Sequence, residues 1–396
     1  MSKINDLIKE LCPCGVEYKS IKDVFVLFSG MTGVTNKWAE DGNCRFIDYM
    51  NAYKNNKIDV NKLPYATVKN TNQTALERGD LLLTSASEVP DECAIASVIE
   101  DEIQDGILMD DHLFGLRLKN EYKGVINTSF VSYYLNSKPF RDNLYKAVRG
   151  VTRFYISNDN YMKLLIPIPP IEVQEEIVRI LDKFGELEAE LEAELEARKS
   201  QYEFWRGELF KDTNNLKTIG ETCDVLTGGE PPEDTIKGIE SDEEHPYPVY
   251  GNGKEIYGYS SSYRVDKDST VISSIGANAG AIYYRQAFFT PIIRLKVVVP
   301  KNDNLLPRYL YYALQTSKFK SKSGSVPNLN ANDIKSIRFP LVSTEEQNRI
   351  VNILDKFEKL INDITAGLPA EIELRRKQYE YYRNKLLSFE ELSVSE

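Results

Sequence analysis

The residues of this 396-residue chain that could bind a metal ion or act as nucleophiles are few and lie far apart. Cys12 and Cys14 are the closely spaced cysteines, and the two histidines are His112 and His245. A structural zinc site takes four such ligands, commonly as two closely spaced pairs. Because no second pair accompanies Cys12 and Cys14, they are typical of a surface turn. The sequence therefore predicts no metal site.

Short stretches that resemble catalytic motifs lack the residues those motifs need. Residues 17–19 and 121–123 match the end of a nuclease Glu-x-Lys motif, but no Pro-Asp precedes either at strand spacing. The glycine-rich residues 273–280 lack the Gly-Lys-Ser/Thr ending of a phosphate loop. Residues 168–171 (Ile-Pro-Pro-Ile) lack the Asn or Asp with which adenine methyltransferases hold an amino group. We therefore predict a protein that is not an enzyme and has no catalytic residue.

An internal repeat organises the rest of the chain. Residues 177–184 (Ile-Val-Arg-Ile-Leu-Asp-Lys-Phe) return 173 positions later as residues 350–357 (Ile-Val-Asn-Ile-Leu-Asp-Lys-Phe). The same shift places Gln174 on Gln347 upstream, whereas the matching segment downstream is displaced by four further residues. Four residues make about one helical turn, so the displacement preserves the apolar face of a helix. The repeat indicates a duplication.

Both copies have apolar residues every three or four positions, which is the pattern of one helix face. The sequence predicts two long helices of about 35–40 residues each, packed against one another. An α-helix rises 1.5 Å per residue. Residues 367–369 (Gly-Leu-Pro) predict a kink or a short break in the second helix. The residues predicted to pack the helix pair are Ile177, Leu181, Phe184, Leu191, Leu195, Tyr202, Ile350, Ile353, Leu354, Phe357, Ile361, Ile364 and Tyr379.

The net charge of −11 is concentrated on the two predicted helices. Residues 172–210 carry about −7 and residues 345–396 about −3, so the other segments are close to neutral and basic clusters within them can act locally. No apolar run approaches the roughly 20 residues that span a bilayer, and the first residues do not form a signal peptide. Five scattered cysteines favour a reducing, cytoplasmic location.

The segments outside the helices predict two globular domains of related design. Strand-like runs alternate with turn residues in residues 18–165, and residues 216–340 follow them loosely. Residues 309–312 parallel residues 131–134, whereas the middles of the two segments share little sequence. A short amphipathic helix at the N-terminus stands where the end of a long helix precedes the second domain. This order predicts a circularly arranged repeat in which the two ends of the chain meet.

At these motifs the chain resembles the DNA-specificity subunit of a type I restriction–modification system. The likeness depends on the Pro-rich entries to both helices, the two Ile-Leu-Asp-Lys-Phe segments, the basic and tyrosine-rich helix ends, and residues 326–329 (Val-Pro-Asn-Leu). The resemblance implies an α+β fold in which two similar mixed α/β target recognition domains are separated by a pair of long antiparallel helices, with a pseudo-twofold internal repeat. The implied boundaries are residues 1–15 for the N-terminal helix, 16–170 and 212–343 for the recognition domains, and 171–211 and 344–390 for the helices.

The resemblance also implies partners and contact residues. The expected partners are double-stranded DNA, two methyltransferase subunits and restriction motor-nuclease subunits. S-adenosylmethionine, Mg²⁺ and ATP are expected only on those subunits, and this chain is expected to hold no cofactor. Lys and Arg suit phosphates, and Asn can pair with base edges. The predicted DNA-binding residues are Lys37, Lys54, Lys57, Lys69, Arg149, Arg153, Tyr250, Asn252, Lys254, Tyr257, Lys318, Lys320 and Lys322.

Two alternatives remain open from the residues alone. Any single lysine of this set could be a solvated surface charge, and the tyrosines could simply pack within strands. The acidic charge also allows a different class of protein, a coiled-coil adaptor whose globular domains bind peptides and do not contact DNA. The dependence of DNA affinity on salt separates the two classes, because phosphate contacts make log affinity fall linearly with log salt.

Overall fold

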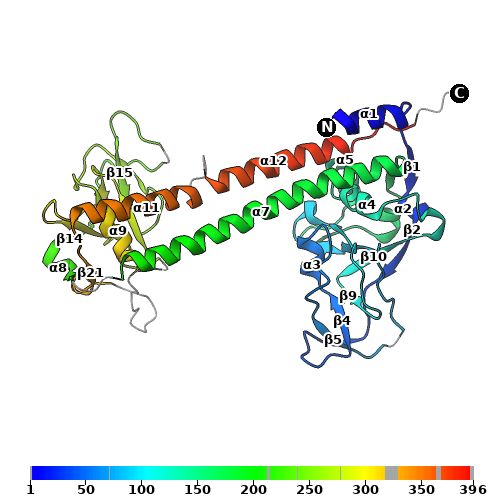
Figure 1. The fold of residues 1–396 in the computed structure, drawn as a ribbon, viewed down its shortest axis with the longest axis horizontal. Coiled ribbons are helices and arrows are strands. Elements are labelled where there is room, and N and C mark those ends of the chain that lie inside the picture. The colour runs from blue at the N-terminus through cyan, green and yellow to red at the C-terminus, as the bar shows by residue number, and fades with distance from the viewer. Residues whose placement is uncertain are drawn as a thin grey trace. The chain divides into compact units, whose positions relative to one another are not determined.

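The computed structural model describes residues 2–70, 72–211, 215–238, 240–276, 278–316, 329–362 and 367–392 (Figure 1). Contacts divide the chain into two compact units, Met1–Glu190 with Glu373–Glu396 (unit 1) and Leu191–Ile372 (unit 2). The division passes through two long helices, α7 (Ile171–Leu209) and α12 (Leu368–Leu386), so each unit combines a globular domain with parts of the long helices. Among the described residues, no helix is both long and apolar enough to cross a membrane.

Unit 1 is built on a four-stranded antiparallel sheet covered by helices. In sheet order its strands are β2 (Phe25–Ser29), β10 (Leu113–Leu118), β6 (Leu81–Thr84) and β8 (Ala96–Val98). The helices of this domain are α1 (Ser2–Leu11), α2 (Ile21–Val24), α3 (Tyr49–Lys54), α4 (Thr128–Leu135), α5 (Lys138–Ala147) and α6 (Asn158–Met162). Helix α4 contacts β8 and buries nearly its whole length.

A second, smaller sheet and two strand pairs complete this domain. The order of the second sheet is β3 (Val34–Lys37), β5 (Tyr65–Val68), β4 (Cys44–Ile47) and β9 (Leu108–Met109). The strand pairs are β1 (Glu17–Ser20) with β12 (Leu165–Ile168), and β7 (Ala86–Ser87) with β11 (Phe154–Tyr155). All of these pairings are antiparallel except β4 with β9, which is parallel. In Figure 1 the β4–β5 end of the domain lies away from α7.

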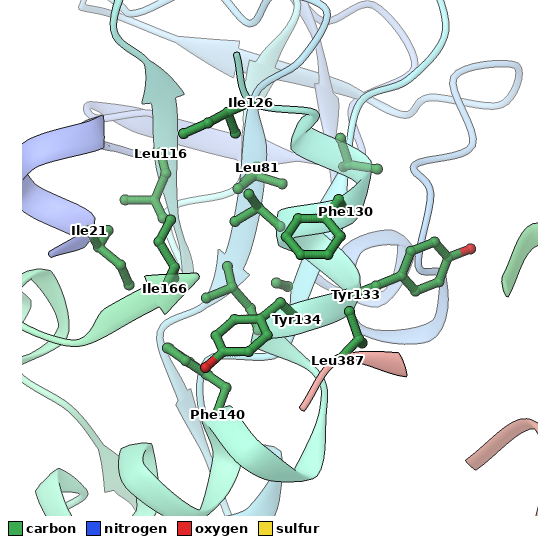
Figure 2. Packing of buried hydrophobic residues seen from close by; sticks show 14 of the residues in the cluster. Ile21, Leu81, Leu116, Ile126, Phe130, Tyr133, Tyr134, Phe140, Ile166 and Leu387 are labelled. Carbon is green, nitrogen blue, oxygen red and sulfur yellow. The ribbon is translucent and has the colours of Figure 1, made fainter. Parts of the chain in front are cut away.

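The core of unit 1 joins residues from distant parts of the sequence. Figure 2 shows Phe130 and Tyr134 of α4 packed among residues of the main sheet, with Leu387 beside them. Leu387 follows α12 and has no exposed surface. Large aromatic and branched aliphatic side chains dominate this cluster, and their burial is the main stabilising term for such a domain.

The two ends of the chain meet within unit 1, as the order of the repeat predicted. Val16 donates its backbone N–H to the carbonyl oxygen of Glu390 at 2.9 Å, and Leu392 donates to Val16 at the same distance. The Tyr18 hydroxyl also donates to the carbonyl oxygen of Phe389 at 3.1 Å. Ile4 of α1 lies in the same core cluster as Leu387. The prediction of a circularly arranged repeat is therefore confirmed.

Unit 2 repeats the framework of unit 1. Its main sheet has the order β14 (Cys223–Thr227), β20 (Lys296–Pro300), β17 (Ser269–Ile272) and β18 (Ile282–Arg285). Strand β13 (Leu216–Thr218) pairs with β21 (Arg338–Pro340), as β1 pairs with β12. The helices are α8 (Ile219–Thr222), α9 (Pro307–Gln315), α10 (Ala331–Lys335) and α11 (Thr344–Asn362).

The units differ in their second sheets. Unit 2 has three strands in the order β16 (Gly258–Ser260), β15 (Tyr247–Tyr250) and β19 (Thr290–Pro291), with β15 and β19 parallel. Unit 1 has four strands at the corresponding place, with the parallel pair at one edge. The predicted fold class, two similar mixed α/β domains with long helices in an internal repeat, is confirmed.

The long helices pack differently along their lengths. Helix α7 is continuous over 39 residues, whereas α11 and α12 have 19 residues each, and α12 begins at Leu368 within the predicted interruption. In unit 1 the Phe184 ring lies 5.5 Å from that of Tyr382, and Glu188 pairs with Arg376 at 2.6 Å, so α7 and α12 run antiparallel there. In unit 2 the rings of Tyr202 and Phe357 lie 6.5 Å apart.

Most residues predicted to pack the helix pair also contribute to the domain cores. Ile177 and Leu181 belong to the core cluster of unit 1 together with α4, so the apolar stripe of α7 is shared between the domain and α12. Ile364 lies outside the described residues. The buried members are Ile177, Leu181, Tyr202, Ile350, Leu354 and Ile361. The partly buried members are Phe184, Leu191, Leu195, Ile353, Phe357 and Tyr379.

Candidate nucleic-acid interface

A buried glutamine holds each domain to its long helix. In unit 1 the Gln174 side chain accepts the backbone N–H of Asn127 at 2.9 Å and donates to the carbonyl oxygens of Val125 and Pro169, at 3.0 and 2.7 Å. Asn127 is the N-cap of α4 and Pro169 lies just before α7, so a single amide satisfies three backbone groups where the two helices begin. Without the Gln174 side chain these three backbone groups would be buried without hydrogen-bond partners.

The same arrangement occurs in unit 2. Gln347 accepts the backbone N–H of Leu306, the N-cap of α9, at 2.9 Å, and donates to the carbonyl oxygens of Asn304 and Val342. Both glutamines are 1% exposed or less. The duplication therefore conserves a specific polar contact as well as the apolar periodicity. Sequence reasoning matched the two glutamines but did not indicate what they bond.

The aspartate of each Ile-Leu-Asp-Lys-Phe segment accepts a tyrosine hydroxyl from its own domain. Tyr133 donates to Asp182 at 2.6 Å, and Tyr312 donates to Asp355 at 2.6 Å. Burial raises the pKa of both tyrosines above the ordinary value, and the hydrogen bond to the carboxylate raises it further. The sequence alignment of residues 131–134 with 309–312 is one residue out of register here, because it placed Tyr133 opposite Tyr311.

Each of these aspartates also pairs with a cation. In unit 1 Lys57 lies 3.0 Å from Asp182 and also pairs with Glu100. In unit 2 Arg308 pairs with Asp355 at 2.8 Å. Partial burial lowers the pKa of Lys57, but the two carboxylates outweigh this and leave it raised. Lys57 was predicted to bind DNA, whereas the structure commits its ammonium group to joining the domain to α7, so we omit it from the candidate interface.

Lys37 is likewise committed to carboxylates. Its ammonium group lies 3.0 Å from Asp110 and pairs with Asp111, and it lies 3.3 Å from Nδ1 of His112. Partial burial lowers its pKa, and the carboxylates of Asp111 and Asp110 raise it to a net value above the ordinary one. Asp110, Asp111 and His112 offer ligand atoms within 4.8 Å of one another, but the Lys37 ammonium already pairs with both carboxylates of this cluster. Because its charge is already paired with carboxylates, Lys37 is a weaker candidate for a phosphate contact than the sequence suggested.

The other predicted cations of unit 1 are exposed. Lys54 ends α3, and Lys69 directly follows β5 of the second sheet. Arg149 and Arg153 lie on a short hairpin between α5 and β11, and both side chains are exposed. These four residues are placed where a polyanion could reach them. Their contact with DNA remains a prediction.

Next to the hairpin lies an open cleft of about 780 Å³. Its walls include the stacked rings of Tyr49 and Tyr53, whose centroids are 5.9 Å apart, and the side chains of Glu92, His112 and Arg153. Aromatic faces together with donors and acceptors are the groups with which proteins contact nucleotide bases. Sequence reasoning did not indicate this cleft, because its walls come from four separate segments.

In unit 2 the predicted residues Tyr250 and Asn252 use their side chains mainly for contacts that hold a loop within the domain. The Asn252 amide accepts the backbone N–H of Ser274 at 2.8 Å and donates to the carbonyl oxygen of Ile293. Tyr250 packs edge-on against Phe289, with ring centroids 5.8 Å apart. This packing matches the alternative that such tyrosines belong to strand packing.

Arg285 is a residue of this loop that sequence reasoning missed. Its guanidinium lies 3.9 Å from the centroid of the Tyr250 ring and donates to the carbonyl oxygens of Gly253 and Lys254, at 3.2 and 2.7 Å. Burial lowers the pKa of Arg285 below its ordinary value. Arg285 therefore fixes the backbone that carries the exposed Lys254.

The remaining predicted residues of unit 2 fall into two groups. Tyr257 is partly buried, and the ammonium group of Lys237 lies 5.5 Å from its ring centroid. Lys318, Lys320 and Lys322 lie outside the described residues. Their assignment stays a prediction.

These features define a modular binding protein with two domains of one design. Each domain is fixed to a long helix through the same buried glutamine and aspartate, and each carries its own set of loops. The description "Type I restriction modification DNA specificity domain" belongs to a family model that matches the chain twice, over residues 13–197 and 211–374. The chain therefore belongs to this family, and the resemblance inferred from its motifs is confirmed.

Individual relatives agree with this assignment. The chain is 36% identical over 292 residues to a type I restriction enzyme specificity subunit of Escherichia coli, covering 66% of this chain and 70% of the relative. It is 32% identical over 318 residues to a putative type I specificity subunit of Mycoplasma pneumoniae, covering 75% and 86%. Family membership implies recognition of DNA sequence and makes the peptide-binding adaptor the weaker class.

Solved structures show the same fold. The crystal structure of the type I restriction–modification S subunit from M. genitalium matches with a TM-score of 0.55 at 16% identity, covering 94% of this chain and 96% of that one. A chain from a study of complex assembly and conformational transition of the type I R-M system matches with a TM-score of 0.61 at 17% identity, covering 94% and 97%.

Proposed function

We propose that this chain is the subunit that reads a bipartite, asymmetric DNA site, with unit 1 reading one half and unit 2 the other. It would dock two adenine methyltransferase subunits and, through them, motor-nuclease subunits. The observation that carries this proposal is the repetition of one anchoring framework with different second sheets and loops. Identical halves would suit a palindromic site, whereas these halves share their supports and differ where a base could be read.

The proposal includes a division of labour among the subunits. The chain itself would do no chemistry and hold no cofactor, so S-adenosylmethionine, Mg²⁺ and ATP would be bound by the partner subunits. Exposed Lys54, Lys69, Arg149 and Arg153 would contact phosphates on the half-site of unit 1, and Lys254 would do so for unit 2. Such contacts position the protein, and groups in the loops between them would read the bases.

A domain exchange tests the proposal. Residues 18–165 begin and end in the paired strands β1 and β12, so their replacement by the matching segment of a relative leaves Gln174 and Asp182 in place. The chimera, expressed with its methyltransferase subunits, is expected to change one half of the methylated site and keep the other. Long-read mapping of methylated adenines in the host genome measures both halves.

A reciprocal chimera is the matched control. Exchange of residues 216–340, bounded by β13 and β21, is expected to change the opposite half. If either chimera altered both halves, or if both active chimeras left the site unchanged, the assignment of one unit to each half would be rejected. Co-purification of the methyltransferase with each chimera shows that the complex has assembled.

A further inference from the structure

The hairpin between α5 and β11 presents an apolar residue between two arginines. Arg149 and Tyr155 close its base through two backbone hydrogen bonds, of 2.8 and 2.9 Å. Tyr155 and the preceding Phe154 form β11, which pairs with β7. The stem is therefore fixed to the domain, and the residues between 149 and 155 form a tip of defined shape.

Gly150 makes this tip possible. Its φ is +123°, and a Cβ atom there would lie 2.0 Å from the carbonyl oxygen of Arg153. Any other residue would force the turn open, because L side chains rarely adopt this conformation and the obstacle is backbone. The tip is thus built as a tight turn before any ligand binds, which reduces the ordering cost on binding.

Val151 stands at the tip and is 89% exposed, more than any other large hydrophobic residue in the described ranges. A single exposed valine is ordinary on a protein surface, so the exposure alone implies nothing. Its position between two cations is the informative feature, because the exposed Arg149 and Arg153 flank Val151 on the same turn. Among the described residues no carboxylate forms an ion pair with either guanidinium, and the Arg149 guanidinium donates to the nearby carbonyl oxygens of Lys146 and Val148.

The surface is therefore cationic at both sides and apolar at the centre. Charge complementarity selects a polyanion, and the edges of a duplex offer one apolar group among their bases, the 5-methyl group of thymine in the major groove. That groove admits a two-stranded ribbon such as this hairpin. We propose that Val151 packs on the 5-methyl group of a thymine in the half-site read by unit 1, with Arg149 and Arg153 on the flanking phosphates.

This inference rests on the proposed function and adds a specificity-determining residue to it. The test uses the full chain in complex with its methyltransferase subunits and a duplex that carries the site mapped in the host genome. Each thymine of the half-site is replaced in turn by deoxyuridine, which removes only the methyl group. Loss of one buried methyl group is expected to weaken binding about fourfold at one position, from roughly 0.8 kcal/mol per apolar carbon.

Substitution of the protein then links that position to the tip. In Val151→Ser the same deoxyuridine is expected to have no effect, whereas Val151→Ile retains the discrimination. Val26→Ser is the matched control, because Val26 is a 53% exposed valine on β2 in the same unit and is expected to leave the fourfold difference intact. Fluorescence anisotropy titrations at fixed salt give all affinities.

Four results would overturn the inference while leaving the proposed function standing. They are a half-site without thymine, deoxyuridine without effect at every position, a deoxyuridine effect that persists in Val151→Ser, and loss of methyltransferase binding in Val151→Ser in place of loss of discrimination. Failure of the proposed function looks different: the wild-type complex would show no preference for the mapped duplex over a scrambled one.

Discussion

Gln174 and Gln347 each place one amide where three backbone groups would otherwise be buried without partners. Leaving a buried backbone group unpaired costs about 1–3 kcal/mol, so each glutamine stabilises the junction between a domain and its helix. Lys57 and Arg308 also join each domain to its helix, through ion pairs with Asp182 and Asp355. Substitutions at these sites would weaken DNA binding indirectly, by loosening the domain.

The cysteines allow a test at this scale. Burial raises the pKa of the Cys223 thiol from 9.0 to about 11, whereas Cys14 is exposed. The thiolate is the reactive form, and at pH 8 roughly one Cys223 in a thousand is ionised, from a pKa of about 11. At pH 8 we expect iodoacetamide to modify Cys14 quickly in the folded protein and Cys223 far more slowly.

Mass spectrometry of the labelled peptides measures both rates. Raising the pH toward 11 should increase the labelling of Cys223, because the thiolate fraction rises as the pH approaches its pKa. Equal labelling rates of the two cysteines at pH 8 in the folded protein would contradict the buried placement of Cys223 in β14.

At the scale of elements, α7 and α12 hold together in unit 1 partly through aromatic contacts. Phe184 lies between Tyr379 and Tyr382, at centroid distances of 6.4 and 5.5 Å. Glu188 and Arg376 add an exposed ion pair, which contributes little by comparison. Leu386 and Leu387, at the end of α12, belong to the core of unit 1. Loss of the contact between α7 and α12 would therefore destabilise the domain as well.

Phe184→Ala is expected to destabilise the docking of α12 by about 2 kcal/mol, combining lost apolar burial with lost ring contacts. Hydrogen exchange of the backbone amides of residues 373–386 should accelerate roughly thirtyfold. Phe204→Ala is the matched control on the same helix, since Phe204 is 60% exposed, and it should leave these amides unchanged. Equal acceleration in both variants would show that Phe184 has no special role.

Local patterns account for what could be predicted of the elements. The periodicity around residues 177–184 and 350–357 depends on neighbours within a few residues, and the helices are found there. Strand-like runs were predicted within residues 18–165, and β10 is one of the strands found there. Contacts between distant residues leave no such pattern, so the pairing of Lys37 with Asp110, the stacking of Arg285 on Tyr250 and the walls of the cleft were missed.

At the scale of the whole molecule, a chain with a net charge of −11 is proposed to bind a polyanion. The net negative charge is concentrated on the long helices, and the exposed cations proposed to contact DNA belong to the domains. At a Debye length of about 8 Å under physiological salt, charges on distant surfaces are screened from one another. Local charge would therefore govern the proposed contact with DNA.

Salt dependence measures the number of phosphate contacts. The logarithm of affinity should fall linearly with the logarithm of salt concentration, with a slope of about −0.9 for each contact. The double variant Arg149→Gln/Arg153→Gln should reduce the steepness of this slope by about 2. The double variant Lys22→Gln/Lys123→Gln removes two other exposed cations of unit 1 and should leave it unchanged. An identical slope in all three proteins would exclude the hairpin from phosphate contact.

The meeting of the two chain ends has a consequence for synthesis on the ribosome. Unit 1 includes the first residues of the chain, but Leu386, Leu387 and the backbone partners of Val16 emerge only near the end. All of unit 2 lies between these two parts. Domains generally fold as units while the chain is being made. The domain that starts first is therefore the last to be completed, and until then its incomplete core depends on protection from aggregation.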